Sequence, residues 1–220
     1  MPELIDARCF QELLDERVAA TPDELMMLDD RGRSVSFAEY REQVDVLAAG
    51  LMPLGVGRDV HVSWIMPTVI EATLMIGALA RLEAIQNPII PIYREREVGF
   101  IARQSKARLL AVPGTYRGFD FLAMAREIAT QVDGLTVLDV SRELPTGDPA
   151  SLPPKPRPTD PDDAPIRFLM YTSGTTSDPK GALHTDWNMI VHSRGLANQL
   201  DLGPTDRVGM VFPITRNCIA

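Results

Sequence analysis

The chain contains very little cysteine. Only Cys9 and Cys218 occur among its 220 residues, and they lie at opposite ends of the sequence. Neither shows a metal-ligand spacing, and the three histidines, His61, His184 and His192, do not cluster. A disulfide framework and a metal site built on cysteine are therefore not predicted. The composition fits a reducing compartment, and we expect a cytoplasmic protein.

Excess positive charge and long apolar runs are also lacking. The chain carries 22 Lys and Arg against 30 Asp and Glu, a formal net charge of -8, so nucleic acid is a poor partner. The most apolar segment, Trp64–Ala84, is interrupted by charges at Glu71, Arg81 and Glu83. Its continuous apolar part, residues 72–80, is far shorter than the roughly 20 residues that span a bilayer. We therefore predict a buried helix here, and no membrane span. The N-terminus shows no signal-peptide pattern.

The first 57 residues are predicted to form two helices and a short hairpin. The hairpin is expected in "LMMLDDRGRSVSF", with its turn at Gly32. The second helix begins in "SFAE", where Ser36 and Glu39 have the spacing of a capping box, in which each side chain accepts from a free backbone N–H group. Apolar residues then recur at three and four positions, which predicts one buried face. Pro53 and Gly55 end this helix.

Strands and helices alternate after Gly57. Short apolar strands are predicted in "DVHVSWIM", in "AIQNPII" (ended by Pro88), in "ARLLAV", in "LTVLDV" and in "IRFLMY". This alternation predicts an α/β fold with a mostly parallel, helix-covered sheet. We expect that sheet in residues 58–182, with residues 1–57 packed on a neighbouring sheet. Residues 183–220 would begin a second α/β subdomain that includes a strand in "DRVGMVFPI".

One loop carries most of the chemistry that the sequence offers. It lies in "MYTSGTTSDPKGALHT", between two predicted strands. Small residues leave backbone N–H groups free to surround an anion, and a lysine adds a charge suited to phosphate. The proline before the lysine keeps a helix from starting there, unlike the Walker loop, so a phosphotransferase is disfavoured. A hydroxyl-rich surface hairpin without a ligand is the alternative. The predicted phosphate-binding residues are Thr172, Ser173, Gly174, Thr175, Thr176 and Lys180.

The string "YTSGTTSDPKG" resembles the phosphate-binding loop of the adenylate-forming (AMP-binding) superfamily. This superfamily includes acyl-CoA and aryl-CoA synthetases, luciferases and the adenylation domains of peptide synthetases. The blocks "SFAEYREQVDVLAAGLMPLGVGRDVHV" and "ALARLEAIQNPIIPIYREREVGFIARQSKARLLAV" extend the resemblance over nearly the whole chain. Within these blocks, the segment "QNPIIPIYREREV" most resembles the corresponding segment of CoA ligases acting on fatty, alicyclic or aromatic acids. The resemblance implies the N-terminal part of the large domain of such an enzyme.

The resemblance also implies an activity. These enzymes use ATP to convert a carboxylic acid to an acyl-adenylate, and coenzyme A then displaces AMP to form a thioester. Residues Thr172 to Thr176 and Lys180 match the loop that holds the β- and γ-phosphates, and Thr172 is the candidate ligand for Mg²⁺. Arg216 stands where the family often has a histidine bordering the acyl pocket, and the catalytic lysine would lie beyond residue 220.

Several alternatives remain open at this point. The chain would be inactive alone, as the N-terminal portion of a ligase or as one half of a split enzyme. It would otherwise be a non-catalytic module that binds a nucleotide or a partner, or an adenylation domain that loads a carrier protein. Apolar surface left exposed in the second subdomain would favour self-association. We interpret His184 as structural.

Overall fold

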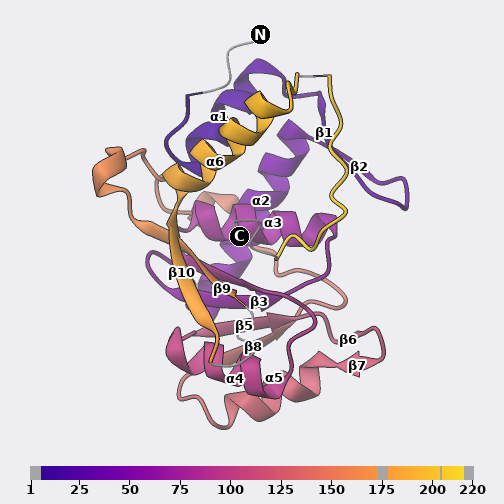
Figure 1. The fold of residues 1–220 in the computed structure, drawn as a ribbon, viewed down its shortest axis with the longest axis vertical. Helices are drawn as coiled ribbons and strands as arrows, with labels where there is room; N and C mark the ends of the chain where they lie inside the picture. The colour runs from indigo at the N-terminus through magenta and orange to yellow at the C-terminus, as the bar shows by residue number, and fades with distance from the viewer. Residues whose placement is uncertain (1–5, 173–177, 204, 216–220) are drawn as a thin grey trace.

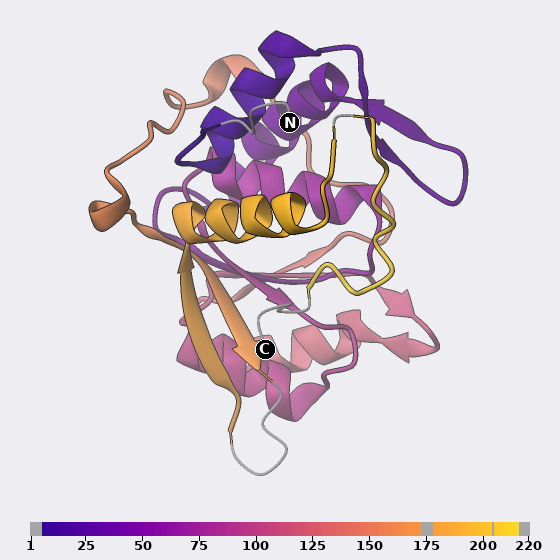
Figure 2. The same ribbon diagram turned by 45° about the horizontal axis from the view of Figure 1, so that its top comes forward.

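A six-stranded mixed sheet with helices on both faces forms the centre of the molecule (Figures 1 and 2). The computed structural model describes residues 6–172, 178–203 and 205–215. In spatial order the strands are β10 (Lys180–Thr185), β9 (Ile166–Thr172), β4 (Ile85–Ile89), β3 (His61–Ile65), β5 (Leu109–Val112) and β8 (Thr136–Asp139). All are parallel to their neighbours except β10, which is antiparallel to β9. The predicted α/β fold class is confirmed.

The helices and the smaller elements complete the fold. The helices are α1 (Phe10–Ala20), α2 (Phe37–Leu51), α3 (Ile70–Arg81), α4 (Glu95–Gln104), α5 (Phe121–Ala129) and α6 (Asp186–Gln199). The two small hairpins pair β1 (Leu25–Leu28) with β2 (Ser34–Ser36) and β6 (Thr115–Tyr116) with β7 (Phe119–Asp120). The short 3-10 turns are η1 (Met52–Leu54), η2 (Pro149–Ser151) and η3 (Pro161–Asp163).

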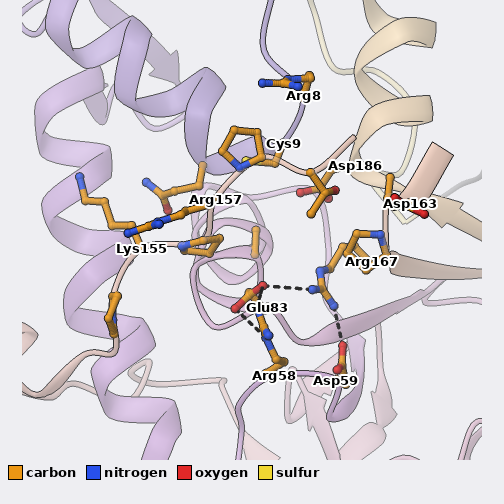
Figure 3. A pocket seen from close by; sticks show the side chains of 18 of the residues that line it. Arg8, Cys9, Arg58, Asp59, Glu83, Lys155, Arg157, Asp163, Arg167 and Asp186 are labelled. Atoms are coloured by element: carbon orange, nitrogen blue, oxygen red, sulfur yellow. Dashed lines mark hydrogen bonds and ion pairs between the residues drawn. The ribbon is translucent and has the colours of Figure 1, made fainter. Parts of the chain in front are cut away.

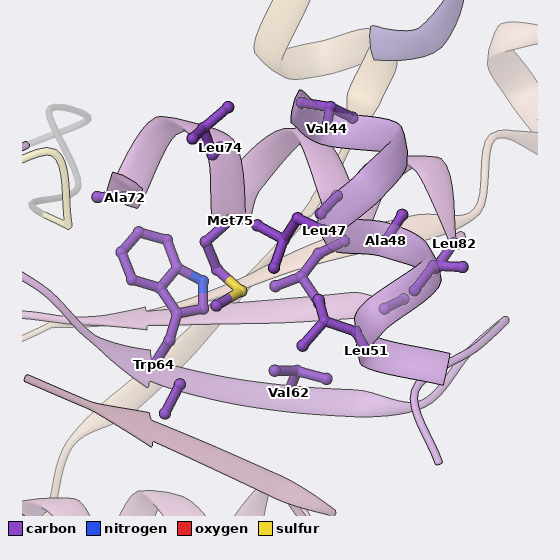
Figure 4. Close-up of a cluster of buried hydrophobic side chains, with 14 of the residues drawn as sticks. Val44, Leu47, Ala48, Leu51, Val62, Trp64, Ala72, Leu74, Met75 and Leu82 are labelled. Atoms are coloured by element: carbon purple, nitrogen blue, oxygen red, sulfur yellow. The ribbon is translucent and has the colours of Figure 1, made fainter. Parts of the chain in front are cut away.

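Helix α2 covers part of one face of the sheet. The capping box at the start of α2 is present, because Ser36 N–H donates to Glu39 Oε2 at 2.8 Å and Glu39 N–H donates to Ser36 Oγ at 3.2 Å. Leu47 and Leu51 then face Val62 of β3 in the core that α2 shares with α3 (Figure 4). On the opposite face, α4 and α5 cover a second apolar core.

Helix α3 is the buried helix predicted for the apolar segment. Nine of its twelve residues are buried, and Figure 4 shows Met75 of this helix beside Trp64 of β3. Among the described residues, no helix has the length and apolarity needed to cross a bilayer.

Pro88 does not end its strand, contrary to the prediction. It lies inside β4, opposite Trp64 of β3. Ile85 donates its N–H to Val60 O on the β3 side at 2.9 Å, and N–H directions alternate along a strand. The donor that Pro88 lacks would therefore point toward β9. A proline is accommodated here because the ladder with β3 stays intact.

The strand predicted in "DRVGMVFPI" is absent, because residues 206–214 make no ladder with any described strand. A segment of residues that favour strands forms a strand only when a neighbouring strand pairs with it, and the sequence does not show whether such a strand is available. Helix α2 lies on the six-stranded sheet. Strand β10 continues that sheet to Thr185. The division into residues 1–57, 58–182 and 183–220 stays a prediction.

Candidate functional site

The predicted phosphate-binding loop connects β9 to β10 at the carboxyl edge of the sheet. Because β9 is parallel to β4, Thr172 ends its strand at the same edge as Ile89 of β4 and Ile65 of β3. Ligands of open α/β sheets bind outside the carboxyl ends of the strands. The hairpin therefore places Thr172 and Lys180 where such sheets bind their ligands.

The two ends of this loop lie opposite each other. Thr172 and Lys180 are register partners, and the Thr172 hydroxyl donates to the carbonyl oxygen of Lys180 at 3.4 Å. Both residues are exposed, and Lys180 forms no ion pair with any residue that the structure describes. The hydroxyl and the ammonium are both available to a ligand. The other predicted members, Ser173, Gly174, Thr175 and Thr176, lie outside the described residues.

The strands below the loop are firmly packed. Phe168, Leu169 and Met170 of β9 are buried. Tyr171 donates its hydroxyl to Gln104 Oε1 at 2.7 Å, which ties the end of β9 to the end of α4. A side chain at Gly181 would approach Leu169 Cδ1 to 2.8 Å, so this position favours glycine. The loop therefore rises from a rigid base.

A second segment reaches the same edge of the sheet. The N–H of Ile214 donates to Thr68 Oγ1 at 3.1 Å, just beyond the carboxyl end of β3. Thr215, the next residue, is buried. Sequence reasoning placed an acyl-pocket position at Arg216, which lies outside the described residues. It did not find Thr68, because nothing local marks a threonine that bonds a segment so distant in sequence.

His184 lies away from the loop. It is four residues along β10 from Lys180, which corresponds to about 13 Å in an extended strand. Burial lowers the pKa of His184, nearby His192 lowers it further, and a hydrogen bond with Asn188 opposes the shift. The imidazole therefore stays neutral near pH 7. Because it lies this far from Lys180, it takes no direct part in the loop site.

A cavity of about 630 Å³ opens at the opposite, amino edge of the sheet (Figure 3). Its floor comes from residues at the starts of β3, β4 and β9, and its wall from the proline-rich connection. Arg58 and Arg167 bind Glu83, and Arg167 also binds Asp59. These ion pairs neutralise the charges on the floor of the cavity, whereas Arg8 and Arg157, which also line it, form no ion pair with any residue that the structure describes. The described residues also contain no group of three or more acidic, histidine or cysteine side chains that could hold a metal ion.

The comparisons with known proteins identify the family. A family described as "AMP-binding enzyme" matches residues 14–216. The chain belongs to this family of AMP-binding enzymes. It is 31% identical over 219 residues to the sulfoacetate–CoA ligase of Cupriavidus necator, covering 97% of this chain and 41% of the ligase. It is 25% identical over 206 residues to tyrocidine synthase 3 of Brevibacillus parabrevis, covering 93% of this chain and 3% of that protein.

Solved structures of AMP-binding enzymes share the fold. The N-terminal domain of FACL13 from Mycobacterium tuberculosis superposes with a TM-score of 0.77 at 21% identity, covering 95% of this chain and 52% of that one. The O-succinylbenzoate coenzyme A synthetase of Bacillus subtilis, solved in complex with AMP, gives 0.75 at 20% identity, covering 92% of this chain and 49% of that one. The chain thus spans about two fifths of the length of the sulfoacetate–CoA ligase and about half of these solved chains.

Proposed function

We propose that this chain is the ATP phosphate-binding part of an acid–thiol ligase of the acyl-CoA synthetase type. The reaction would join a carboxylic acid to ATP, giving an acyl-adenylate and pyrophosphate, and then to the thiol of coenzyme A. The observation that carries the proposal is the pairing of exposed Thr172 and Lys180 at the carboxyl edge of the sheet. A cytoplasmic location and a role in fatty acid metabolism are part of the same proposal.

The chemistry expected of these two residues is electrostatic. The pyrophosphate leaving group gains negative charge as the carboxylate attacks, and donors directed at that charge lower the barrier. The Lys180 ammonium would bind phosphate oxygens as a flexible point charge, and Ser173–Thr176 would add hydroxyl and backbone donors. A magnesium ion would supply positive charge that offsets the charge of the phosphates. Thr172 fits it as a single protein ligand, since its hydroxyl is exposed and Mg²⁺ usually takes few ligands from the protein.

Binding of ATP tests the proposal directly. We expect calorimetry with ATP and Mg²⁺ to show binding by the wild-type chain, and Lys180→Ala to weaken it about tenfold to a hundredfold, the usual loss for a hydrogen bond to a charged group. Arg31→Ala is the matched control, because Arg31 is an exposed cation in the turn between β1 and β2, which form a separate sheet away from β9 and β10 (Figure 2). Equal affinity of both variants would refute a phosphate-binding role for Lys180.

Activity is expected to need the portion of the ligase that this chain does not span. Residues 1–220 alone should show no ATP–pyrophosphate exchange with a panel of carboxylates, and addition of the remaining portion should restore it. Exchange by the isolated chain would contradict this expectation. Since a peptide synthetase is among the relatives, a carrier-protein thiol is the second candidate acceptor, and comparison of coenzyme A with a carrier protein in the restored enzyme would separate the two.

Exposed apolar side chains follow the hairpin. They lie on β10, on α6 and in the segment after it: Leu183, Val191, Leu196, Leu200, Val208, Met210, Val211 and Phe212. Exposed apolar side chains in such number favour association when they gather on one surface. We therefore expect the isolated chain to self-associate in size-exclusion chromatography as its concentration rises, and a monomer at every concentration would contradict this.

A further inference from the structure

Few backbone ladder pairs join strand β9 to the neighbouring strand β4, although most of its side chains are buried. The ladder between β3 and β4 has five register pairs, whereas that between β4 and β9 has one, Gln86 with Phe168. Pro88 lacks the backbone donor that would point toward β9. Backbone hydrogen bonds alone therefore do little to fix the position of β9 along β4, and the phosphate-binding loop is attached to the end of β9.

A buried arginine at the start of β9 supplies a different attachment. Arg167 is 6% exposed, and its Nη1 donates to Asp59 Oδ1 at 2.8 Å while its Nη2 donates to Glu83 Oε1 at 3.2 Å. Glu83 also accepts from Arg58, at 2.9 and 2.7 Å. Figure 3 shows Arg167 reaching both Glu83 and Asp59 from the β9 side. The guanidinium thus connects β9 to the turns before β3 and β4.

Both carboxylate residues have an unusual backbone. Asp59 has a φ of 60° and Glu83 a φ of 56°, in the left-handed region where glycine is normally preferred. The two turns are joined to each other, since Asp59 N–H donates to Glu83 O at 2.9 Å. A side chain at a backbone position that glycine would adopt without strain points to a role for the side chain itself. The contact that the two carboxylates share is the Arg167 guanidinium.

The second strand of the hairpin ends in the same region. Asp186 follows β10 directly, lines the same cavity, and accepts from the N–H of Phe10 at 3.1 Å. Burial raises the pKa of Asp186, while the positive charge of Arg167 acts in the opposite direction. The ends of both hairpin strands that lie farthest from the loop are therefore held at the amino edge of the sheet.

We propose that Arg167, held by Asp59 and Glu83, is a positioning residue for Thr172 at the end of β9. By fixing the start of β9, it sets how far along β4 Thr172 lies, about 17 Å from Arg167 along an extended strand. This inference rests on the proposed function for its consequence, which is ATP affinity. The attachment of β9 through Arg167, Asp59 and Glu83, here called the clamp, does not depend on ATP and can be measured separately.

Amide hydrogen exchange with ATP titration tests the proposal. Arg167→Met keeps an unbranched side chain of similar length in the buried site but removes the ion pairs. We expect it to speed exchange of the amides of Leu169–Thr172 at least about tenfold relative to those of Val44–Leu47 in α2, and to weaken ATP binding several-fold. Arg167→Lys, which keeps the charge and can hold one carboxylate at a time, should restore part of both effects.

Two further variants guard against general destabilisation. Asp59→Asn removes one carboxylate while keeping a residue that tolerates positive φ, and it should reproduce a smaller version of the Arg167→Met effects. Arg33→Met removes an arginine that pairs with Asp29 and Glu71 at the surface, and should leave β9 exchange unchanged. Exchange that rises equally in α2 and β9, or no rescue by lysine, would overturn the positioning role. Absence of ATP binding by the wild type would refute the proposed function. The exchange data would still show whether the Arg167 clamp fixes the position of β9.

Discussion

Gly77 of α3 faces Tyr40 and Val44 of α2 at short range, and its replacement by alanine tests how tightly these helices pack. A Cβ at Gly77 would lie 2.5 Å from Tyr40 Oη and 2.5 Å from Val44 Cγ2. Both neighbours are fully buried, and the Tyr40 hydroxyl donates to Thr73 O at 2.8 Å. Neither side chain has free space into which it could move.

The magnitude follows from three opposing effects. Alanine is favoured over glycine inside a helix by about 1 kcal/mol. Overpacking a buried contact costs about 1–3 kcal/mol, and displacing Tyr40 endangers a hydrogen bond worth about 1 kcal/mol. We therefore expect Gly77→Ala to lower the free energy of unfolding by about 1–3 kcal/mol, measured by urea denaturation.

The matched control is the same substitution in α6. Nothing lies within 4 Å of a Cβ at Gly195, which is exposed, so Gly195→Ala should raise stability by about 0.5–1 kcal/mol. Tyr40→Phe removes the hydroxyl in closest contact, so Gly77→Ala should cost less in that background. If Gly77→Ala stabilises the protein as Gly195→Ala does, the inferred close packing is wrong.

Three further predictions concern a helix cap and two buried ionisable groups. Ser36→Ala should cost about 1 kcal/mol in urea denaturation because it removes the capping box, whereas Ser34→Ala, at an exposed position in β2, should be neutral. Burial raises the pKa of Asp186 above its ordinary 3.8, so the native state holds this proton more tightly and wild-type stability falls as pH rises through that raised pKa. Asp186→Asn should therefore compare more favourably with wild type at pH 7 than at pH 4, and an equal difference at both would contradict this. Burial lowers the pKa of His184 below 6.5, so the contribution of the neutral imidazole to stability is fully present above pH 6.5 and is lost as the pH falls through the lowered pKa. We therefore expect His184→Gln to reduce the loss of stability between pH 7 and pH 5. An unchanged loss would count against this prediction.

Local patterns predicted the elements well where one face of an element is buried. The capping box at Ser36 and the apolar face that follows it depend on neighbours within one helical turn, so the sequence contains the whole signal. The hairpin around the proposed phosphate-binding loop was predictable for a similar reason, since an apolar strand, a run of small residues and a second strand occur in order. The prediction for residues 206–214 failed because a strand also needs a partner.

The amino-acid sequence by itself determined the fold class, the positions of most helices and strands, and the chemistry available at Thr172 and Lys180, because each depends on residue type and short-range periodicity. The tertiary structure alone decided that α2 lies on the six-stranded sheet and that Pro88 sits inside β4. It also decided that Arg167 meets carboxylates 108 and 84 residues away in the chain. Such contacts follow from the order and direction of strands in a sheet, and strand order is set by packing over the whole domain and leaves no local pattern.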